Sequence, residues 1–331
     1  MKVYPRPAVE GALPYGELVE RLAPAFVQLS RGEASMPPRV AARLERLQAY
    51  LGAMPAYLPE PGVLACKLVS VFPQNAAAGL PTHHALLLAF DPKTGEPLAL
   101  MDAEAITARR TAAASALAAR LLGPAQPWTL AIFGSGVQAH AHLEAFSELF
   151  RLREAVLWGR TPERVRALGE RARQLGLRWR EAGSAEEAAR VAEVLVLATH
   201  ADRPLFDPDS VRPGAHVCSV GLNPSGRGEL PGGLLGRARL FVESRASAFA
   251  PPPAGAPELS LALAEGHLRS PEDAAELGEV IDGSRPGRTA PDEVTVYKSV
   301  GVAVEDAAAA SLVLERAASA GSVDLGGETI R

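Results

Sequence analysis

Residues 129–142 have the residue types and the spacing of a phosphate-binding turn. An apolar run at 130–133 ends abruptly at Gly134, and a helix-compatible segment follows. Gly134 would let the backbone turn sharply, Gly136 would leave room for a pyrophosphate beside the main chain, and Ala139 would let helix and strand pack closely. The first N–H groups of the helix would face the phosphates. The alternative is an ordinary buried turn. The pattern predicts a dinucleotide site that includes Gly134, Ser135, Gly136, Val137 and Gln138.

The end of the next predicted strand, residues 155–158, indicates which dinucleotide is bound. NAD-specific domains usually carry an acidic residue about 20 residues after the glycines, where it binds the ribose hydroxyls. Here the strand is followed by Gly-Arg160-Thr161, and Glu163 already belongs to the following helix. Arg160 and Thr161 suit a 2′-phosphate, so we expect NADPH, with NADH as a possibility. Thr161 could also cap the helix that begins at Pro162, and the two roles are compatible.

Strands and helices alternate through the rest of this region, which predicts a parallel, doubly wound sheet of the α/β class. Further strands are expected at 194–198, 216–220 and 240–242, and a last one within 294–301. Strand ends and turns of such a sheet face the nicotinamide crevice. The residues expected there are Thr199, Val220, Ser299 and Gly301.

The chain before this region reads differently. Residues 13–52 show apolar residues at helical spacing and predict two helices, broken at 36–39. Strands are then expected at 63–72, 85–90 and 98–101, with a tight hairpin turn at residues 91–95 and a helix of small residues at 103–122. The strands carry few polar residues on either face, as expected of a sheet buried on both sides, with a second subunit covering one of them. An alanine-rich helix at 302–320 should pack back onto this N-terminal part.

Composition excludes several classes of protein. A formal charge of −4 over 331 residues argues against a nucleic-acid or anionic-membrane partner, and no apolar run is long enough to span a membrane. The N-terminus lacks the apolar core of a signal peptide, so the cytoplasm is expected. Cys66 and Cys218 lie in apolar runs and are expected to be reduced and buried. No metal site is predicted, since no metal-ligand grouping is evident among His83, His84, His140, His142 and His200.

Five segments together resemble the ornithine cyclodeaminase/mu-crystallin family. They lie at residues 67–75, 100–113, 134–139, 158–161 and 297–306, in the order in which that family has them, and the resemblance extends from about 36 to 312. Thr82-His83, the Ile-Thr-Ala-Arg-Arg-Thr-Ala-Ala run and Trp158-Gly-Arg-Thr161 are most similar to its ketimine-reducing, mu-crystallin branch. The resemblance implies a homodimer. It implies a Rossmann dinucleotide-binding domain at 119–303 and an α+β substrate and dimerisation domain at 1–118, joined by 304–331.

The resemblance places Arg39, Lys67 and Arg110 around the carboxylate of a small α-amino or α-imino acid. Charge-assisted hydrogen bonds from guanidinium groups suit such an anion, although each basic residue taken alone could be a solvated surface charge. Arg110 and Thr111 lie in the middle of a mostly alanine helix, an unusual place for a charge without a ligand. We expect Thr111 to contact the cofactor and Arg109 to be a solvated neighbour.

Two positions depart from the cyclodeaminases of the family. Where they carry an aspartate, this chain has Asn223, and where they carry a glutamate near Met54, the nearest counterpart is Gly52. Ornithine cyclodeamination needs a proton acceptor, which an asparagine amide cannot be at neutral pH. Reduction of a preformed ketimine needs a carboxylate clamp, a cofactor and a proton source, and Lys67 could be that source. Lys67 and Asn223 are thus the candidate catalytic residues.

The sequence therefore predicts an NAD(P)H-dependent reductase of small α-imino acids, with ketimines such as pyrroline-2-carboxylate as leading substrates. Three alternatives remain open. The first is ornithine cyclodeaminase, a lyase that recycles bound NAD. The second is alanine dehydrogenase. The third is a non-enzymatic protein that binds NADPH and a small ligand.

Overall fold

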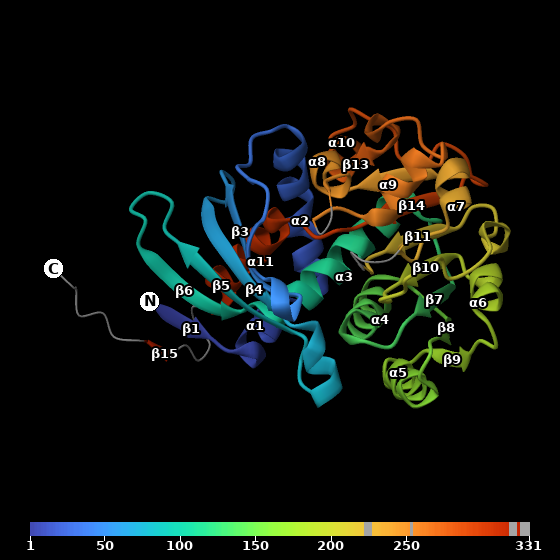
Figure 1. Ribbon diagram of the computed structural model, residues 1–331, viewed down its shortest axis with the longest axis horizontal. Helices are drawn as coiled ribbons and strands as arrows, with labels where there is room; N and C mark the ends of the chain where they lie inside the picture. Colours follow the sequence, from blue (N-terminus) through green and yellow to red (C-terminus); the bar gives the residue numbers. More distant parts are fainter. Residues whose placement is uncertain (222–226, 252–253, 318–322, 325–331) are drawn as a thin grey trace. The chain divides into compact units, whose positions relative to one another are not determined.

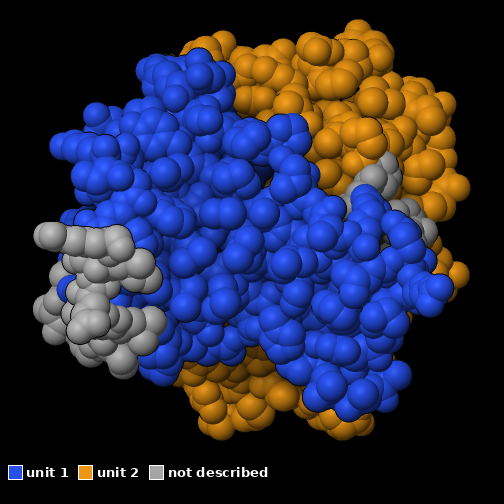
Figure 2. Space-filling view, turned by 60° about the vertical axis from the view of Figure 1, so that its left-hand side comes forward, with its two compact units in different colours: residues 1–110, 302–331 blue, residues 111–301 orange. Residues whose placement is uncertain are grey.

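The computed structural model describes residues 1–221, 227–251, 254–317 and 323–324. The chain divides into two compact units, coloured separately in Figure 2. Unit 1 comprises residues 1–110 and 302–331, and unit 2 comprises residues 111–301. The sequence boundaries expected above lie at 118/119 and 303/304, eight and two residues from those of the units. Unit 1 is thus built from both ends of the chain.

Unit 1 contains a seven-stranded sheet in the order β15-β1-β6-β5-β4-β3-β2 (Figure 1). Its pairings are antiparallel except for the parallel pair β1 and β6. Its strands are β1 (Lys2–Tyr4), β2 (Val40–Leu44), β3 (Ala49–Leu58), β4 (Val63–Val71), β5 (His83–Phe90), β6 (Pro97–Asp102) and β15 (Val323–Asp324). Its helices are α1 (Arg6–Ala12), α2 (Tyr15–Ser30), α11 (Ala303–Arg316) and the first part of α3 (Ala103–Leu122). The predicted strands, the small-residue helix and the closing helix are all confirmed, and α11 does pack on α2 and on β3, β4 and β5.

The second predicted helix is wrong. Residues 40–58 form a hairpin of β2 and β3, joined by a short 3-10 turn at Glu45–Leu47 and by Gln48 in the left-handed region. Leu44, Leu47 and Leu51 do recur at helical spacing, but all three are exposed and bury no common face. Long-range pairing of β3 with β4 over nine residue pairs outweighs this local periodicity.

The two faces of this sheet differ in exposure. Along β3 and β4 buried and partly exposed residues alternate, as expected for a sheet with one covered face. The covered face includes a row of directly paired residues across β3 to β6, namely Met54, Lys67, Leu87 and Met101. The other face is largely apolar and includes Leu51 and Leu86, which are 49% and 50% exposed. The expectation that a second subunit covers this face stays a prediction.

Unit 2 contains an eight-stranded sheet in the order β13-β12-β14-β11-β10-β7-β8-β9 (Figure 1). All its pairings are parallel, which confirms the predicted doubly wound sheet. Its strands are β7 (Thr129–Phe133), β8 (Glu154–Trp158), β9 (Arg178–Glu181), β10 (Val194–Leu197), β11 (His216–Ser219), β12 (Arg239–Val242), β13 (Ala275–Glu276) and β14 (Thr295–Lys298). The chain proceeds from β7 outward to β8 and β9, then returns to β10 on the other side of β7. The carboxyl edge at β7 and β10 is therefore the switch point where ligands of such sheets bind.

The helices of unit 2 join these parallel strands. The longest are α4 (Val137–Leu149) and α5 (Pro162–Gln174). The others are α6 (Ala185–Val191), α7 (Gly232–Arg237), α8 (Arg245–Ala248), α9 (Pro257–Ala264) and α10 (Leu277–Ile281). None of the helices in the described parts of the chain has both the length and the apolar character needed to cross a lipid bilayer.

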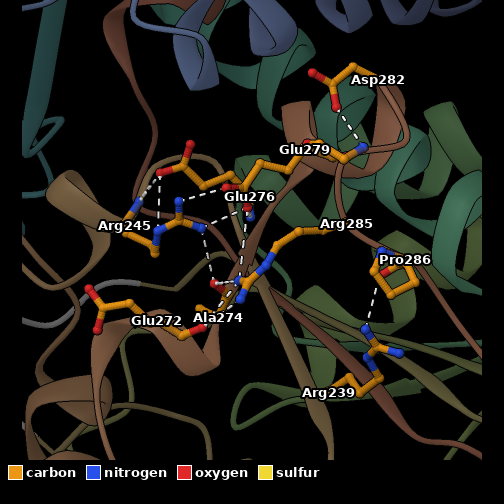
Figure 3. Close-up of polar contacts among 10 residues, drawn as sticks. Arg239, Arg245, Glu272, Ala274, Glu276, Glu279, Asp282, Arg285 and Pro286 are labelled. Atoms are coloured by element: carbon orange, nitrogen blue, oxygen red, sulfur yellow. Dashed lines mark hydrogen bonds and ion pairs between the residues drawn. The ribbon is translucent and has the colours of Figure 1, made fainter.

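A network of arginines fastens the β13 side of unit 2 (Figure 3). The guanidinium of Arg245 binds both carboxylate oxygens of Glu279 at 2.7 Å, and its main-chain N–H donates to Glu276. Arg285 donates to the carbonyl oxygens of Glu272 and Ala274. The bidentate ion pair joins α8 to α10, and the Arg285 contacts satisfy main-chain carbonyls in a region of short elements, so the network is structural.

The buried histidines of unit 2, His142 and His216, and its one cysteine, Cys218, also have structural roles. The Nδ1–H of His142 donates to the carbonyl of Gln138, and its Nε2 accepts from the Ser115 hydroxyl at 2.9 Å, while burial lowers the pKa of His142 to about 4. Burial lowers the pKa of His216 to about 3, and the Nε2 of His216 lies 3.2 Å from the Cys218 sulfur. Burial also raises the pKa of Cys218, so both members of this pair stay neutral. The two cysteines are free, with Cys66 only half-buried, and no metal-binding group is found in the described chain.

Candidate functional site

Unit 1 contains a buried cluster of charged side chains centred on Lys67. Lys67 lies on β4, within an otherwise apolar row, and its side chain is 4% exposed. Its ammonium group lies 2.8 Å from Oδ2 of Asp306 on α11 and donates to the Thr107 hydroxyl on α3 at 3.4 Å. A buried lysine needs a counter-charge, and Asp306 supplies it. The cluster therefore joins the sheet to two helices that are about 200 residues apart in sequence.

Arg110 belongs to the same cluster. It lies on α3, three residues after Thr107, and its side chain is 4% exposed. Its Nε donates to Oδ1 of Asp306 at 3.0 Å, and its Nη1 binds the Glu305 carboxylate. These contacts fix the plane of the guanidinium. They also show that the unusual position of Arg110 in an alanine helix is explained in part by carboxylates of the protein itself.

Burial and the neighbouring charges tune the acidity of this cluster. Burial lowers the pKa of Lys67 to about 8, against the opposing attraction of Asp306. Burial would raise the pKa of Asp306, but the charges of Arg110 and Lys67 outweigh it and hold that pKa below its usual value. Lys67 can therefore give up a proton near neutral pH while Asp306 stays ionised, which is the property of a general acid with a fixed counter-ion.

Arg39 lies close to Lys67 in the strand register of the sheet. It directly precedes β2, where Val40 pairs with Ala53, and the next residue of β3, Met54, pairs with Lys67. Arg39 is half-buried, and its positive charge acts to lower the pKa of Tyr50, which burial raises. The neighbour of Arg110, Arg109, is half-buried over the ring of Tyr15 at 4.7 Å, so it has a packing role rather than the fully solvated position expected for it.

The glycine turn of unit 2 has the geometry of a phosphate-binding turn. Gly134 has a φ of 107°, and a Cβ there would lie 2.4 Å from the carbonyl oxygen of Ala198 after β10. Its N–H donates to the carbonyl of Trp158 at the end of β8. At Gly136, by contrast, a Cβ would meet no atom within 4 Å. Packing within the protein therefore requires glycine at 134 but not at 136, whereas a phosphate close to the main chain accounts for Gly136.

A hollow in the surface of unit 2 lies at this turn. It adjoins the first turn of α4, where the N–H groups of a helix lack partners within the helix, and the side of α5. Val137 is 72% exposed beside it, although it is apolar. The residues that line the hollow are Ser135, Gly136, Val137, His140, Arg164 and Ala167.

Arg160 and Thr161 follow β8 at the same edge of the sheet, and both are exposed. Thr161 occupies the N-cap position of α5, yet its side chain makes no capping hydrogen bond. Within the described residues neither the guanidinium of Arg160 nor that of Arg164 has a partner. Glu163, the acidic residue that follows, instead binds Arg166 at 3.1 Å. This end of β8 therefore presents two guanidinium groups and a hydroxyl with no competing carboxylate.

The remaining predicted cofactor residues lie at the carboxyl ends of neighbouring strands. Thr199 follows β10, Val220 follows β11, and Ser299 and Gly301 follow β14. Buried carboxylates hold the turns that carry them: Glu229 accepts from Thr199, and Glu243 accepts from the N–H of Gly301 at 3.0 Å. Thr199 is thus already bonded through both its main-chain N–H and its hydroxyl.

Sequence reasoning missed the carboxylates that organise both sites. Glu305 and Asp306 lie in the 297–306 segment that carries the family resemblance, but neither is assigned a role there, and Glu229 stands in the sequence as a lone glutamate. Of the predicted residues, Thr111 is buried on α3, and its assignment to the cofactor stays a prediction. Asn223 lies outside the described residues.

Comparison with known proteins agrees with the resemblance seen in the sequence. The chain matches the model of the ornithine cyclodeaminase/mu-crystallin family over residues 3–321. It is 37% identical over 302 residues to the ketimine reductase mu-crystallin of Mus musculus, an alignment that covers 90% of this chain and 91% of that protein.

Solved structures show the same relationship. The Delta(1)-pyrroline-2-carboxylate reductase of Thermococcus litoralis, in complex with NADH and L-proline, is 33% identical with a TM-score of 0.91, covering 98% of this chain and 100% of that one. An archaeal alanine dehydrogenase dimer with bound NAD is 30% identical with a TM-score of 0.89, covering 98% of this chain and 99% of the other. The chain therefore belongs to the ornithine cyclodeaminase/mu-crystallin family.

Proposed function

We propose that this protein is an NAD(P)H-dependent reductase of small α-imino acids, with cyclic ketimines such as pyrroline-2-carboxylate as its leading substrates. The observation that carries the proposal is the buried pair of Lys67 and Asp306, in which a lysine can release a proton near pH 8. The dinucleotide turn at Gly134 supplies the second requirement. Relatives named ketimine reductase and pyrroline-2-carboxylate reductase support the same reaction.

The residues present fit a dinucleotide, because Gly136 leaves open space at the N-terminus of α4. When bound, the reduced nicotinamide supplies a hydride to the carbon of a C=N bond. Lys67 gives the accompanying proton to the nitrogen, so that the imine becomes an amine and the balance of atoms and charge is complete. Asp306 holds the ammonium of Lys67 in place and stabilises its charged form between turnovers.

Arg110 and Arg39 bind the substrate carboxylate in this proposal. The contacts of Arg110 with Glu305 and Asp306 orient its guanidinium before the substrate arrives, so little conformational entropy is lost on binding. Lys67, Arg110, Glu305 and Asp306 together carry no net charge. The positive charge of Arg39 then offsets the carboxylate of a substrate whose imine nitrogen is neutral and takes its proton from Lys67.

The main alternative is ornithine cyclodeaminase, and the two reactions differ in stoichiometry. We expect the wild type to oxidise one NADPH for each preformed cyclic ketimine reduced, measured by absorbance. With ornithine and catalytic NAD it should release almost no ammonia, because Asn223 cannot accept a proton, and general-base assistance is typically worth about 10²–10⁴-fold. Asn223→Asp should gain some ammonia release. Rapid conversion of ornithine to proline by the wild type would favour the lyase instead.

Lys67 as proton donor gives a defined pH dependence. The donor must be protonated, so kcat/KM for ketimine reduction should be flat below pH 8 and fall about tenfold per pH unit above it. Lys67→Ala should lower kcat by roughly 10²–10⁴-fold and abolish this dependence, while NADPH still binds. Arg109→Ala, which removes a charge from the same helix as Arg110, is the matched control and should leave the profile unchanged. Full activity of Lys67→Ala would exclude this role.

Arg160 and Thr161 carry the proposed preference for NADPH. Arg160→Ala should raise the Michaelis constant for NADPH by about tenfold, as the loss of one charge-assisted hydrogen bond predicts, and leave that for NADH nearly unchanged. Arg166→Ala, whose side chain is engaged with Glu163 on the same helix, should change neither. The measurement is steady-state kinetics with both cofactors. A wild type that prefers NADH contradicts the assignment.

We also propose a homodimer formed through the apolar face of the unit 1 sheet. Leu68, Leu86 and Leu88 lie side by side on it, on strands β4 and β5, and charged residues are few there. An archaeal relative is described as a dimer. Leu86→Asp should shift the mass measured by light scattering from dimer to monomer, because it buries an uncompensated charge at the interface. Val191→Asp, at an exposed valine of unit 2, should not. A monomeric wild type would rule the interface out.

A further inference from the structure

We infer that Glu229 is a positioning residue of the cofactor site: with Lys298, it locks together the two turns that follow β10 and β11. The inference rests on the proposed function, because it assigns these turns to the nicotinamide half of the dinucleotide. In parallel sheets ligands bind outside the carboxyl ends of the strands, and β10 and β11 are neighbours at that edge.

The carboxylate of Glu229 is 1% exposed and accepts four hydrogen bonds. Its Oε2 accepts from the main-chain N–H of Thr199 at 2.9 Å and from the Thr199 hydroxyl at 2.7 Å. Its Oε1 accepts from the N–H of Gly221 and from the hydroxyl of Ser219, both at 2.8 Å. Each oxygen therefore anchors one turn, and one carboxylate couples the two.

Lys298 completes the lock from β14. It is fully buried and donates to the carbonyl of Gly221 at 2.6 Å and to the Ser219 hydroxyl at 3.2 Å. Its charge is balanced by Glu258 at 2.8 Å. The N–H of Gly221 thus binds an anion and its carbonyl binds a cation, so the main chain is held on both sides of the Gly221 Cα.

Close packing between the two turns leaves no room for a side chain at Gly221. A Cβ at Gly221 would lie 2.3 Å from the carbonyl oxygen of Thr199 and 2.4 Å from Oε2 of Glu229. Only glycine fits at that distance from main-chain atoms. The Thr199 turn in turn lies against Gly134, where a Cβ would meet the Ala198 carbonyl and the Thr199 side chain. The lock at Glu229 is therefore continuous with the phosphate-binding turn itself.

Glu229→Gln tests the inference sharply because it keeps the shape of the side chain. Each oxygen of Glu229 accepts one main-chain N–H, so the amide nitrogen of glutamine must face the N–H of either Thr199 or Gly221. The two hydroxyl groups can rotate to accept from it, but a main-chain N–H cannot. One turn necessarily loses its anchor.

The readouts separate positioning from folding. We expect Glu229→Gln to weaken NADPH binding about tenfold in calorimetry, corresponding to about 1.4 kcal/mol, and to change binding of ADP-ribose, which lacks nicotinamide, less than about twofold. It should also lower kcat for ketimine reduction while the KM for the ketimine stays within about twofold. Glu276→Gln, in the arginine network of Figure 3, is a matched buried control and should alter neither ligand.

Ser219→Ala provides a second variant, should Glu229→Gln fail to fold. It removes the hydroxyl between Lys298 and Glu229 but leaves both main-chain N–H groups bonded, so NADPH binding should weaken only about threefold. Wild-type affinity for NADPH in the folded variants, or equal losses for NADPH and ADP-ribose, would overturn the inference. A wild type that binds NADPH but reduces no ketimine would contradict the proposed function alone. The comparison of NADPH and ADP-ribose binding would still decide the role of Glu229.

Discussion

The burial of Lys67 imposes the constraint on which the rest of unit 1 depends. An ammonium group with 4% exposure destabilises the fold unless a counter-charge lies beside it, and Asp306 fills that place from the far end of the chain. The same carboxylate also binds Arg110, so a sheet strand and two helices meet at one group. Removing Asp306 would leave the buried ammonium of Lys67 without its counter-charge, and loss of one partner of a buried ion pair typically costs about 3–5 kcal/mol. The site and the core of unit 1 are therefore the same structure.

Much of the fold could be predicted because its signals are local. The apolar run before Gly134, the hairpin turn at 91–95 and the small-residue helix α3 each contain their own start and stop signals, and the structure has all three. The helix expected at 40–52 failed for the opposite reason. Its leucines recur at helical spacing, but the segment forms strands because β3 pairs with β4, which is a separate part of the sequence.

The site could be predicted where one residue is unusual for its own segment. It could not be predicted where the residue's hydrogen-bond or ion-pair partners lie far away in the sequence. Lys67 and Arg110 stood out as charges within apolar segments, and both lie in the buried cluster. Their partner Asp306 lies 196 residues from Arg110, and no spacing rule connects them. Glu229 is a similar case, since its donors come from the ends of two strands and only the sheet order brings them together.

Small side chains explain how so many charges can be buried at once. In α11 every residue from 303 to 313 is buried, and a helix buried on all sides must be apolar or very small on most of them. Alanine at 307–310 lets α11 pack closely against α2 and the sheet, which brings Glu305 and Asp306 within reach of Arg110. Larger residues there would separate the helix from β4 and lengthen the contact of Asp306 with Lys67. The alanines of α11 are thus a physical requirement of the charged cluster, although none of them carries chemistry.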